Sequence, residues 1–272
     1  MIATNISPGG PYRVLLAFPP KAGGTFLKLV LKTVLPKCCL MRGSITPEDQ
    51  SLNTLNYSAW TAATKRKRCR SVLGHIHLAP TERDARVMKD LGITPVLMKR
   101  NIADSLLSMH EMVLRQENDP AFDEGKRNEM PQFGSAGPLT DYLKMSVERQ
   151  KDFLIYNFGP WFLKYYSSWY YVCRTTGIEV LRLSFDEFRS DETETVVRIL
   201  QWAGATEVDK PAIAEACASV RGRGHEARYW YGVSGRAKTF FDARHFAHLH
   251  TLAAPYGFAP SEIETLTGDG SA

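Results

Sequence analysis

Short apolar runs alternate with longer amphipathic stretches along most of the chain, and this alternation is the feature that most limits its fold. The runs are rich in Val, Leu and Ile, as buried parallel strands are, and they lie at residues 13–18, 71–74, 94–99 and 179–183. Helix-period stretches lie at residues 25–35, 81–91, 102–115, 139–156, 161–175 and 193–203. The alternation predicts an α/β fold with a central, mostly parallel sheet flanked by helices.

Local end signals support several of these boundaries. Thr81 is a helix-capping residue, Glu82 follows in the first turn, and Gly92 comes just after the last helical position. The Gly159-Pro160 pair predicts a break between the helices at 139–156 and 161–175.

Size and charge limit the class of protein. The chain has 272 residues, of which 44% are hydrophobic and 23% charged, so we expect a single domain over residues 1–272. The net charge of +5 favours an anionic ligand but is too small to indicate nucleic acid. No apolar window reaches the roughly 18 residues of a membrane helix, so no transmembrane segment is expected. Oligomeric state is not predicted.

The five cysteines are odd in number and scattered, and none forms a CxxC pair. This pattern predicts neither a disulfide framework nor a zinc site. Together with a polar N-terminus that lacks a signal-peptide pattern, it leads us to expect a cytoplasmic protein.

The stretch AFPPKAGGTF, residues 17–26, connects the first predicted strand to the first predicted helix. A helix N-terminus offers N–H groups and a positive dipole end, glycines allow close approach of an anion, and lysine adds a mobile charge. The stretch predicts an anion cradle, and the alternative is an ordinary β–α turn with a solvated lysine. The order differs from the Walker A motif, in which lysine follows the glycines, and no GxGxxG follows a strand.

Two segments do not fit the regular alternation. Residues 116–138 are polar, with three prolines and three glycines, and predict a long loop of the kind that forms a lid over an acceptor. Residues 221–241 are rich in Arg, Gly and aromatic residues. They predict either a basic surface loop or a segment that wraps an anion and a flat ring.

The stretch at residues 17–26 also resembles a loop of a known family. Its order, Pro20-Lys21-Ala22-Gly23-Gly24-Thr25-Phe26, is similar to the PKSGTTW loop of sulfotransferases that use 3′-phosphoadenosine-5′-phosphosulfate (PAPS). The resemblance implies a P-loop-like sulfotransferase fold and PAPS as the co-substrate. It implies that Lys21, Ala22, Gly23, Gly24, Thr25 and Phe26 bind the 5′ end of the nucleotide. Lys21 would meet the charge on the leaving group, and Phe26 would stack on adenine in place of tryptophan.

A second motif of that family is an arginine at a strand end with a serine eight residues later, and both bind the 3′-phosphate. In VLMKRNIADSLLS, Arg100 and Ser108 have this spacing. Arginine is suited to bidentate phosphate contacts. The alternatives are a surface ion pair for Arg100 and an ordinary helical serine for Ser108.

A third stretch, GHIHLAP at residues 74–80, resembles the Lys-Thr-His-Leu-Pro-like stretch that carries the catalytic histidine of the family. His77 matches that histidine and His75 takes the place of the lysine. The resemblance implies that His77 is the general base, and an ordinary imidazole pKa near 6.5 suits that role. A structural histidine and a metal pair are the alternatives, but no third metal ligand is implied.

Two further stretches resemble adenine and 3′-phosphate contacts. Phe185 stands where the family has a tyrosine that touches adenine. Residues 232–238, GVSGRAK, are similar to the C-terminal GISGDWK-like stretch, with Gly232 at its start. Trp230-Tyr231 replace the Arg-Lys pair that precedes it in the family, so Arg228 or Arg236 is expected to contact the 3′-phosphate instead.

The resemblance therefore implies transfer of a sulfuryl group from PAPS to a hydroxyl or amine of a small-molecule or carbohydrate acceptor. No metal is expected to be required, because a sulfuryl group carries less charge than the phosphoryl group for which kinases use Mg²⁺. The tract ARHFAHLH is not expected to bind metal either, because His245 and His248 share a helix face while His250 points elsewhere. The alternatives are a P-loop-like kinase of a small metabolite and a non-catalytic module that binds a nucleotide or an anionic glycan.

Overall fold

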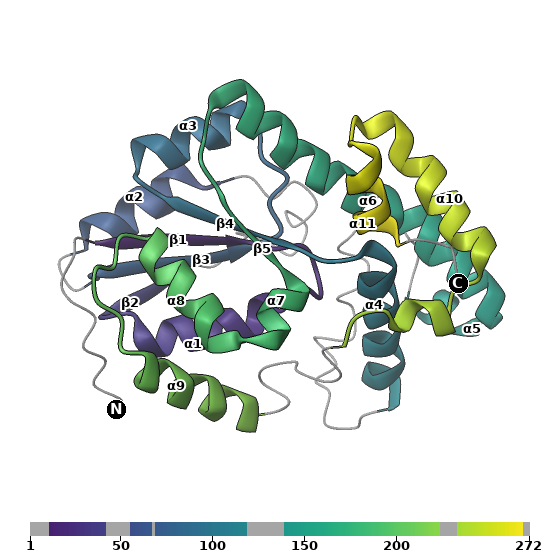
Figure 1. The fold of residues 1–272 in the computed structure, drawn as a ribbon, viewed down its shortest axis with the longest axis horizontal. Coiled ribbons are helices and arrows are strands. Elements are labelled where there is room, and N and C mark those ends of the chain that lie inside the picture. Colours follow the sequence, from purple (N-terminus) through teal and green to yellow (C-terminus); the bar gives the residue numbers. More distant parts are fainter. Residues whose placement is uncertain (1–10, 42–54, 67–68, 119–138, 224–232, 269–272) are drawn as a thin grey trace. The chain divides into compact units, whose positions relative to one another are not determined.

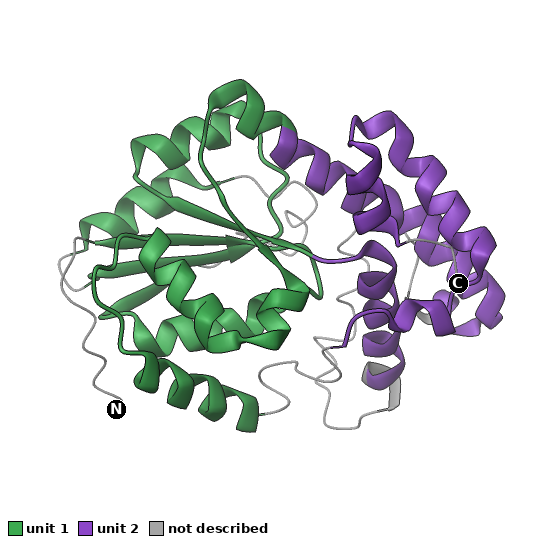
Figure 2. Ribbon diagram, in the orientation of Figure 1, with its two compact units in different colours: residues 1–45, 53–99, 171–232 green, residues 46–52, 100–170, 233–272 purple. Residues whose placement is uncertain are grey.

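The computed structural model describes residues 11–41, 55–66, 69–118, 139–223 and 233–268 (Figure 1). The chain divides into two compact units, which we treat separately (Figure 2). Unit 1 comprises Met1–Ile45, Asn53–Lys99 and Tyr171–Gly232. Unit 2 comprises Thr46–Leu52, Arg100–Tyr170 and Val233–Ala272. The expectation of a single domain stays a prediction.

Unit 1 contains a parallel sheet, as the alternation predicts. Its strands are β1 (Tyr12–Ala17), β2 (Cys38–Met41), β3 (Ser71–Ile76), β4 (Thr94–Lys99) and β5 (Leu181–Ser184), in the spatial order β2-β3-β1-β4-β5. Ala17 at the end of β1 lies opposite Ile76 of β3 and Leu97 of β4. Because all strands run the same way, the residues that follow β1 and β3 leave the sheet side by side.

Helices cover both faces of this sheet (Figure 1). Those of unit 1 are α1 (Gly24–Val34), α2 (Tyr57–Lys65), α3 (Glu82–Asp90), α7 (Phe185–Ser190), α8 (Glu192–Trp202) and α9 (Lys210–Gly222). α1 buries Phe26, Leu27, Val30, Leu31 and Val34, which recur at helical spacing and join the core cluster shared with α8 and α9. Full burial of such side chains stabilises the fold by roughly 1.5–3 kcal/mol each, so this stripe holds α1 firmly against the sheet.

Unit 2 is helical where the structure describes it. Its helices are α4 (Ile102–Asn118), α5 (Leu139–Lys144), α6 (Val147–Thr176), α10 (Ala243–Ala253) and α11 (Pro260–Thr267), with 3-10 turns η4 (Arg236–Thr239) and η5 (Ala254–Tyr256). The last residues of α6, from Tyr171 on, belong to unit 1.

The predicted break at Gly159-Pro160 is wrong, because α6 continues through Pro160. An interior proline removes one backbone hydrogen bond and costs about 3 kcal/mol. The buried aromatic stripe of α6 runs across the proline, with Phe158 before it and Phe162, Tyr165, Tyr166 and Trp169 after it, all at most 1% exposed. Burial of this stripe outweighs the loss of one bond.

Other boundaries also differ from the prediction. β2, α2, α7, α9 and α11 were not predicted. β2 is a four-residue strand at the edge of the sheet, and its side chains are not fully buried. α4 extends to Asn118, so the predicted loop does not start at residue 116. The rest of the predicted acceptor lid, residues 119–138, lies outside the described residues.

The cysteine pattern predicted no disulfide framework, but two of the five cysteines are bonded to each other. Cys39 in β2 and Cys69 just before β3 form a disulfide across 30 residues, with Cα atoms 5.7 Å apart. β2 and β3 are neighbouring strands, and the two cysteines meet through this tertiary pairing, which no short spacing motif reveals. Disulfides are typical of oxidising compartments, so this bond does not fit the expected cytoplasmic location. That location stays a prediction. Among the helices described, none is long and apolar enough to cross a membrane.

Thiol counting tests this disulfide. Cys38, Cys173 and Cys217 are free, so alkylation of the denatured protein without reductant should modify these three and leave Cys39 and Cys69 unmodified. Reduction should expose all five. Since the bond closes a loop of 30 residues, it should contribute about 3–4 kcal/mol to the free energy of unfolding. Five reactive thiols in protein purified without reductant would contradict the pairing.

Candidate functional site

The loop after β1 has an unusual backbone. Pro19 and Pro20 are buried, and the N–H of Ala22 donates to the carbonyl of Pro19 at 3.3 Å. Lys21 adopts a positive φ of 65°, which is uncommon for a residue other than glycine, and Gly23 has a φ of 81°. Left-handed residues within such a turn bring successive backbone N–H groups toward one side, a geometry that forms anion-binding nests.

The N-terminus of α1 differs from those of its neighbours. Its N-cap is Gly23, no side chain caps the helix, and the first turn holds no acidic residue. By contrast, a side chain at the N-cap accepts a backbone hydrogen bond in α2, α3, α7, α8, α9 and α10. α1 therefore presents the N–H groups of its first turn and the positive end of its dipole without a side-chain cap and without an acidic residue in that turn.

The two glycines of this loop are packed too closely for a side chain. A Cβ on Gly23 would lie 2.6 Å from Cε1 of Phe188 in α7, and a Cβ on Gly24 would collide with Nε2 of His75. Both glycines are therefore required by packing, Gly23 against α7 and Gly24 against β3. Gly23 is also required by its positive φ.

His77 is held beside this loop by a hydrogen bond. Its Nδ1 lies 2.6 Å from the carbonyl oxygen of Phe18, which links the segment after β3 to the residue that follows β1. A carbonyl only accepts, so Nδ1 must carry the proton, and the neutral ring then has its lone pair on Nε2. The ring of His75 lies 5.5 Å from that of His77, in an edge-to-face arrangement.

Two aromatic residues expected at adenine are in the core instead. Phe26 is 1% exposed and packs against Phe188, with ring centroids 5.7 Å apart. Phe185 is 4% exposed and packs against the same ring at 5.8 Å. Neither ring face is open to a ligand, so the structure corrects the expected stacking. The backbone N–H of Phe26 still belongs to the first turn of α1.

In unit 2, Arg100 is buried rather than on the surface, with 7% of its area exposed. The hydroxyl of Tyr166 accepts from its backbone N–H at 3.0 Å and donates to its carbonyl at 3.1 Å. Burial raises the pKa of Tyr166, so the hydroxyl keeps the proton that it donates. Tyr166 thus fixes the backbone of Arg100 from both sides.

α4 binds the C-terminal segment through one face. Asp104, Ser108 and Glu111 follow each other at spacings of four and three, which places them on one side of the helix. Asp104 accepts hydrogen bonds from the N–H groups of Gly235 at 2.7 Å and Ala237 at 2.9 Å. Glu111 binds the guanidinium of Arg236 through both oxygens, one of them at 3.2 Å. Ser108 lies between these two anchors on the helix and is partly exposed.

This geometry changes the expectation for the C-terminal arginines. Arg236 already has a bidentate carboxylate partner, so an anion would have to compete with Glu111 for it. Arg228 and Gly232, also expected at the nucleotide, lie outside the described residues.

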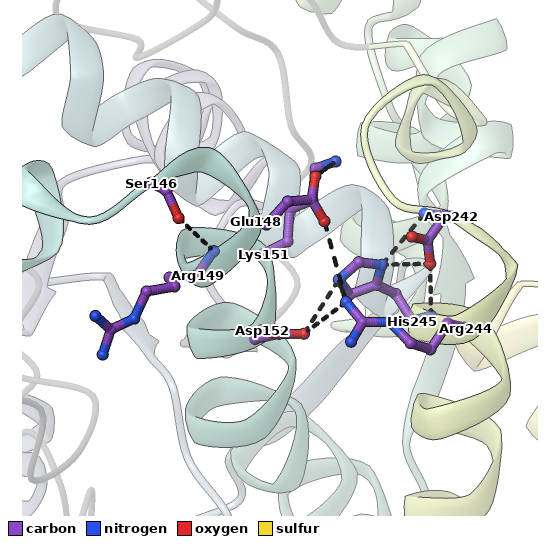
Figure 3. Close-up of polar contacts among 8 residues, drawn as sticks. All are labelled: Ser146, Glu148, Arg149, Lys151, Asp152, Asp242, Arg244 and His245. Carbon is purple, nitrogen blue, oxygen red and sulfur yellow. Dashed lines mark hydrogen bonds and ion pairs between the residues drawn. The ribbon is translucent and has the colours of Figure 1, made fainter.

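A second polar cluster in unit 2 joins α6 to α10 (Figure 3). His245 is 2% exposed; its Nδ1 lies 2.7 Å from Asp242 and its Nε2 lies 3.4 Å from Asp152. Glu148, Asp242 and His245 place three potential ligand atoms within 4.8 Å of one another. Arg244 lies 3.2 Å from Asp152 and 4.0 Å from Glu148 and supplies positive charge to the same carboxylates. We therefore assign this cluster to structure, and the expectation that no metal is needed stays a prediction.

Comparison with known proteins finds similar folds among solved structures. No protein-family model and no curated protein sequence matches the chain. Among solved structures, mouse sulfotransferase SULT7A1 complexed with PAP is similar, at 15% identity and a TM-score of 0.57, over 91% of this chain and 86% of that one. Retinol dehydratase in complex with androsterone and PAP is similar at 14% identity and a TM-score of 0.53, over 93% and 84% of the two chains.

The chain therefore has the fold of these sulfotransferases, which confirms the fold class expected from the sequence. A second structure of retinol dehydratase, with retinol and PAP, matches at 14% identity and a TM-score of 0.50, over 92% of this chain and 82% of that one.

Three residues of the site were missed by sequence reasoning. Tyr166, Asp104 and Glu111 were not predicted to be part of the site. Each acts on a backbone or side chain far away in sequence, from 66 residues for Tyr166 to 133 for Asp104. The one local signal was the spacing of Asp104 and Glu111 around Ser108.

Proposed function

We propose that the protein is a sulfotransferase that moves the sulfuryl group of PAPS to a hydroxyl or amine of a small-molecule or carbohydrate acceptor. The observation that carries the proposal is the uncapped, carboxylate-free N-terminus of α1, with Lys21 in its loop and an oriented imidazole beside it. The fold supports the proposal, because two similar structures hold PAP together with androsterone or retinol.

PAPS would supply an activated sulfuryl group attached to its 5′-phosphate. The N–H groups of Gly23 to Phe26 and the hydroxyl of Thr25 would bind that phosphate, as helix N-termini do. Lys21 would stabilise the negative charge that builds on the leaving group. These roles fit the loop, whose backbone already presents donors and whose first turn contains no carboxylate to repel an anion.

His77 would take the proton of the acceptor. With Nδ1 bound to the carbonyl of Phe18, the ring presents Nε2 as the accepting atom, and the bond fixes its direction. This tautomer is the one a general base requires.

The other end of the nucleotide would be bound by one residue of α4 and by one that lies two positions before this helix. Arg100 and Ser108 would hold the 3′-phosphate, with the backbone of Arg100 fixed by Tyr166.

A PAPS-dependent transfer screen tests the proposal. The acceptor panel should include steroid and retinoid alcohols, phenols, amines and sugars, and a product heavier by one sulfuryl group should form only with PAPS. Transfer from ATP that depends on Mg²⁺ would instead support a small-metabolite kinase. Tight binding of PAP without turnover of any acceptor would favour a non-catalytic nucleotide-binding module.

Cofactor selection gives a second test. The wild-type protein should bind PAP much more tightly than AMP, because only PAP carries a 3′-phosphate. Arg100→Ala should remove most of this difference, weakening PAP by about 10- to 100-fold, since loss of a charged hydrogen bond often costs 1.5–3 kcal/mol. Calorimetry with both nucleotides measures it.

Arg86→Ala is the matched control, since Arg86 is exposed on α3 and its side chain donates to the carbonyl of Glu82 in the same helix, at 3.4 Å. It removes the same charge and should leave both affinities unchanged. Equal affinity of the wild type for PAP and AMP would exclude a 3′-phosphate site.

A further inference from the structure

We infer that Asp104 is a positioning residue for nucleotide binding: it holds the segment Ser234–Ala237 in place over the α4 face that carries Ser108. The expected effect on nucleotide binding rests on the proposed function. The anchoring of the segment by Asp104 rests on contacts within unit 2 alone. Asp104 would not contact the nucleotide itself, because both of its oxygens accept from the segment.

The carboxylate of Asp104 is fully committed to the segment. It is 4% exposed, and each of its oxygens accepts one backbone N–H, from Gly235 at 2.7 Å and from Ala237 at 2.9 Å. A buried carboxylate is costly unless it is hydrogen-bonded, so the side chain and the segment require each other. The bonds span 131 and 133 residues, so they determine where the C-terminal segment lies.

The segment has the conformation that this carboxylate needs. Gly235 has a φ of 78°, precedes the 3-10 turn η4, and would place an added Cβ in open space. Its glycine is thus required by the backbone angle and not by packing. The turn directs the N–H groups of residues 235 and 237 toward the same side chain.

Further contacts fix the segment along α4. Glu111 binds Arg236 one helical turn beyond Ser108, and the ring of His110 packs on Phe240 with centroids 4.6 Å apart. Lys151 lies 5.4 Å from the centroid of the same Phe240 ring. Asp104 is the member of this set that binds backbone rather than a side chain, so it determines the path of the chain beside Ser108.

The consequence concerns the 3′-phosphate. The N–H groups of Gly235 and Ala237 are occupied by Asp104 and cannot serve as phosphate donors, so the segment would act by enclosing Ser108 rather than by donating from these two positions. Loss of the anchor should therefore weaken binding of PAP selectively over AMP, which lacks the 3′-phosphate.

Asp104→Asn tests the inference, because asparagine has the same shape but replaces one acceptor with a donor. In the protein without nucleotide, hydrogen exchange of the Gly235 and Ala237 amides should accelerate at least about tenfold. Binding of PAP should weaken about tenfold, while binding of AMP should not change. Ser105→Ala is the control: Ser105 is buried on the same turn, and its hydroxyl donates to the carbonyl of Asn101 at 3.0 Å, within its own helix turn.

A second variant guards against unfolding. Gly235→Ala disturbs the same anchor from the solvent side, where an added Cβ meets no atom, and should reproduce the loss of PAP selectivity. Unchanged exchange in Asp104→Asn would overturn the anchor. Faster exchange with an unchanged ratio of PAP to AMP affinity would overturn the positioning role. A wild type that does not distinguish PAP from AMP would overturn the proposed function itself, whatever the exchange shows.

Discussion

His77→Ala should lower the rate of sulfuryl transfer by about 10²- to 10⁴-fold while leaving PAP affinity nearly unchanged. The magnitude is that expected for removal of a general base. The ring contacts the carbonyl of Phe18 through Nδ1, so the substitution removes the base without altering the first turn of α1. Single-turnover rates at saturating PAPS, combined with calorimetry, separate the two effects. The fall in rate at acidic pH should also disappear, because the imidazole that serves as base is no longer there to be protonated.

A matched variant separates the chemistry of His77 from its structural bond. The amide of His77→Asn can still donate to the carbonyl of Phe18 but offers no base at the Nε2 position. It should be as slow as the alanine variant, and its thermal stability should be closer to that of the wild type.

His75→Ala distinguishes the two histidines. His75 packs its Nε2 against Gly24, so its loss should disturb the loop and reduce the rate less than loss of His77. An inactive His75→Ala with an active His77→Ala would show that the base is His75. Activity in both would place the base elsewhere or indicate an acceptor that is already a good nucleophile.

The fold was predictable from sequence because its signals are local. Apolar runs identify β1, β3, β4 and β5, and the strand order that brings β1 beside β3 places the loop and the histidine stretch at one edge. β2 was not predicted because it is a strand of four residues at the edge of the sheet, too short to be distinguished from a loop. The break at Pro160 was wrongly predicted because the burial that overrides a proline is tertiary.

The candidate site was predictable only where motifs preserve order. The loop of Lys21 follows β1 and His77 follows β3, as expected from the sequence, and a hydrogen bond joins the two segments. Their roles stay predictions. The ring positions of Phe26 and Phe185 were not predictable, since burial depends on α7, whose Phe188 packs against both. The bond of Cys39 to Cys69 and the anchor at Asp104 each join distant residues, which no spacing in the sequence reveals.

Lys21→Ala should lower the transfer rate by about 10²- to 10³-fold, the range seen when one preorganised group that stabilises transition-state charge is lost. Affinity for PAP should fall only a few-fold, because backbone N–H groups of α1 and Thr25 would still bind the 5′-phosphate. Lys21 has a φ of 65°, and alanine carries the same Cβ as lysine, so the backbone strain is equal in both proteins and the loop should keep its path. The measurement is the single-turnover rate at saturating PAPS beside calorimetry with PAP.

Lys21→Arg and Lys21→Gly complete the comparison. Arginine keeps the positive charge but on a wider planar group, so it should recover part of the rate. Glycine removes the charge and also relieves the positive φ, so it should be as slow as alanine but more stable to heat. A rate that stays near that of the wild type in Lys21→Ala, with PAP affinity lost instead, would mean that Lys21 binds the nucleotide in its ground state and does not stabilise the leaving group.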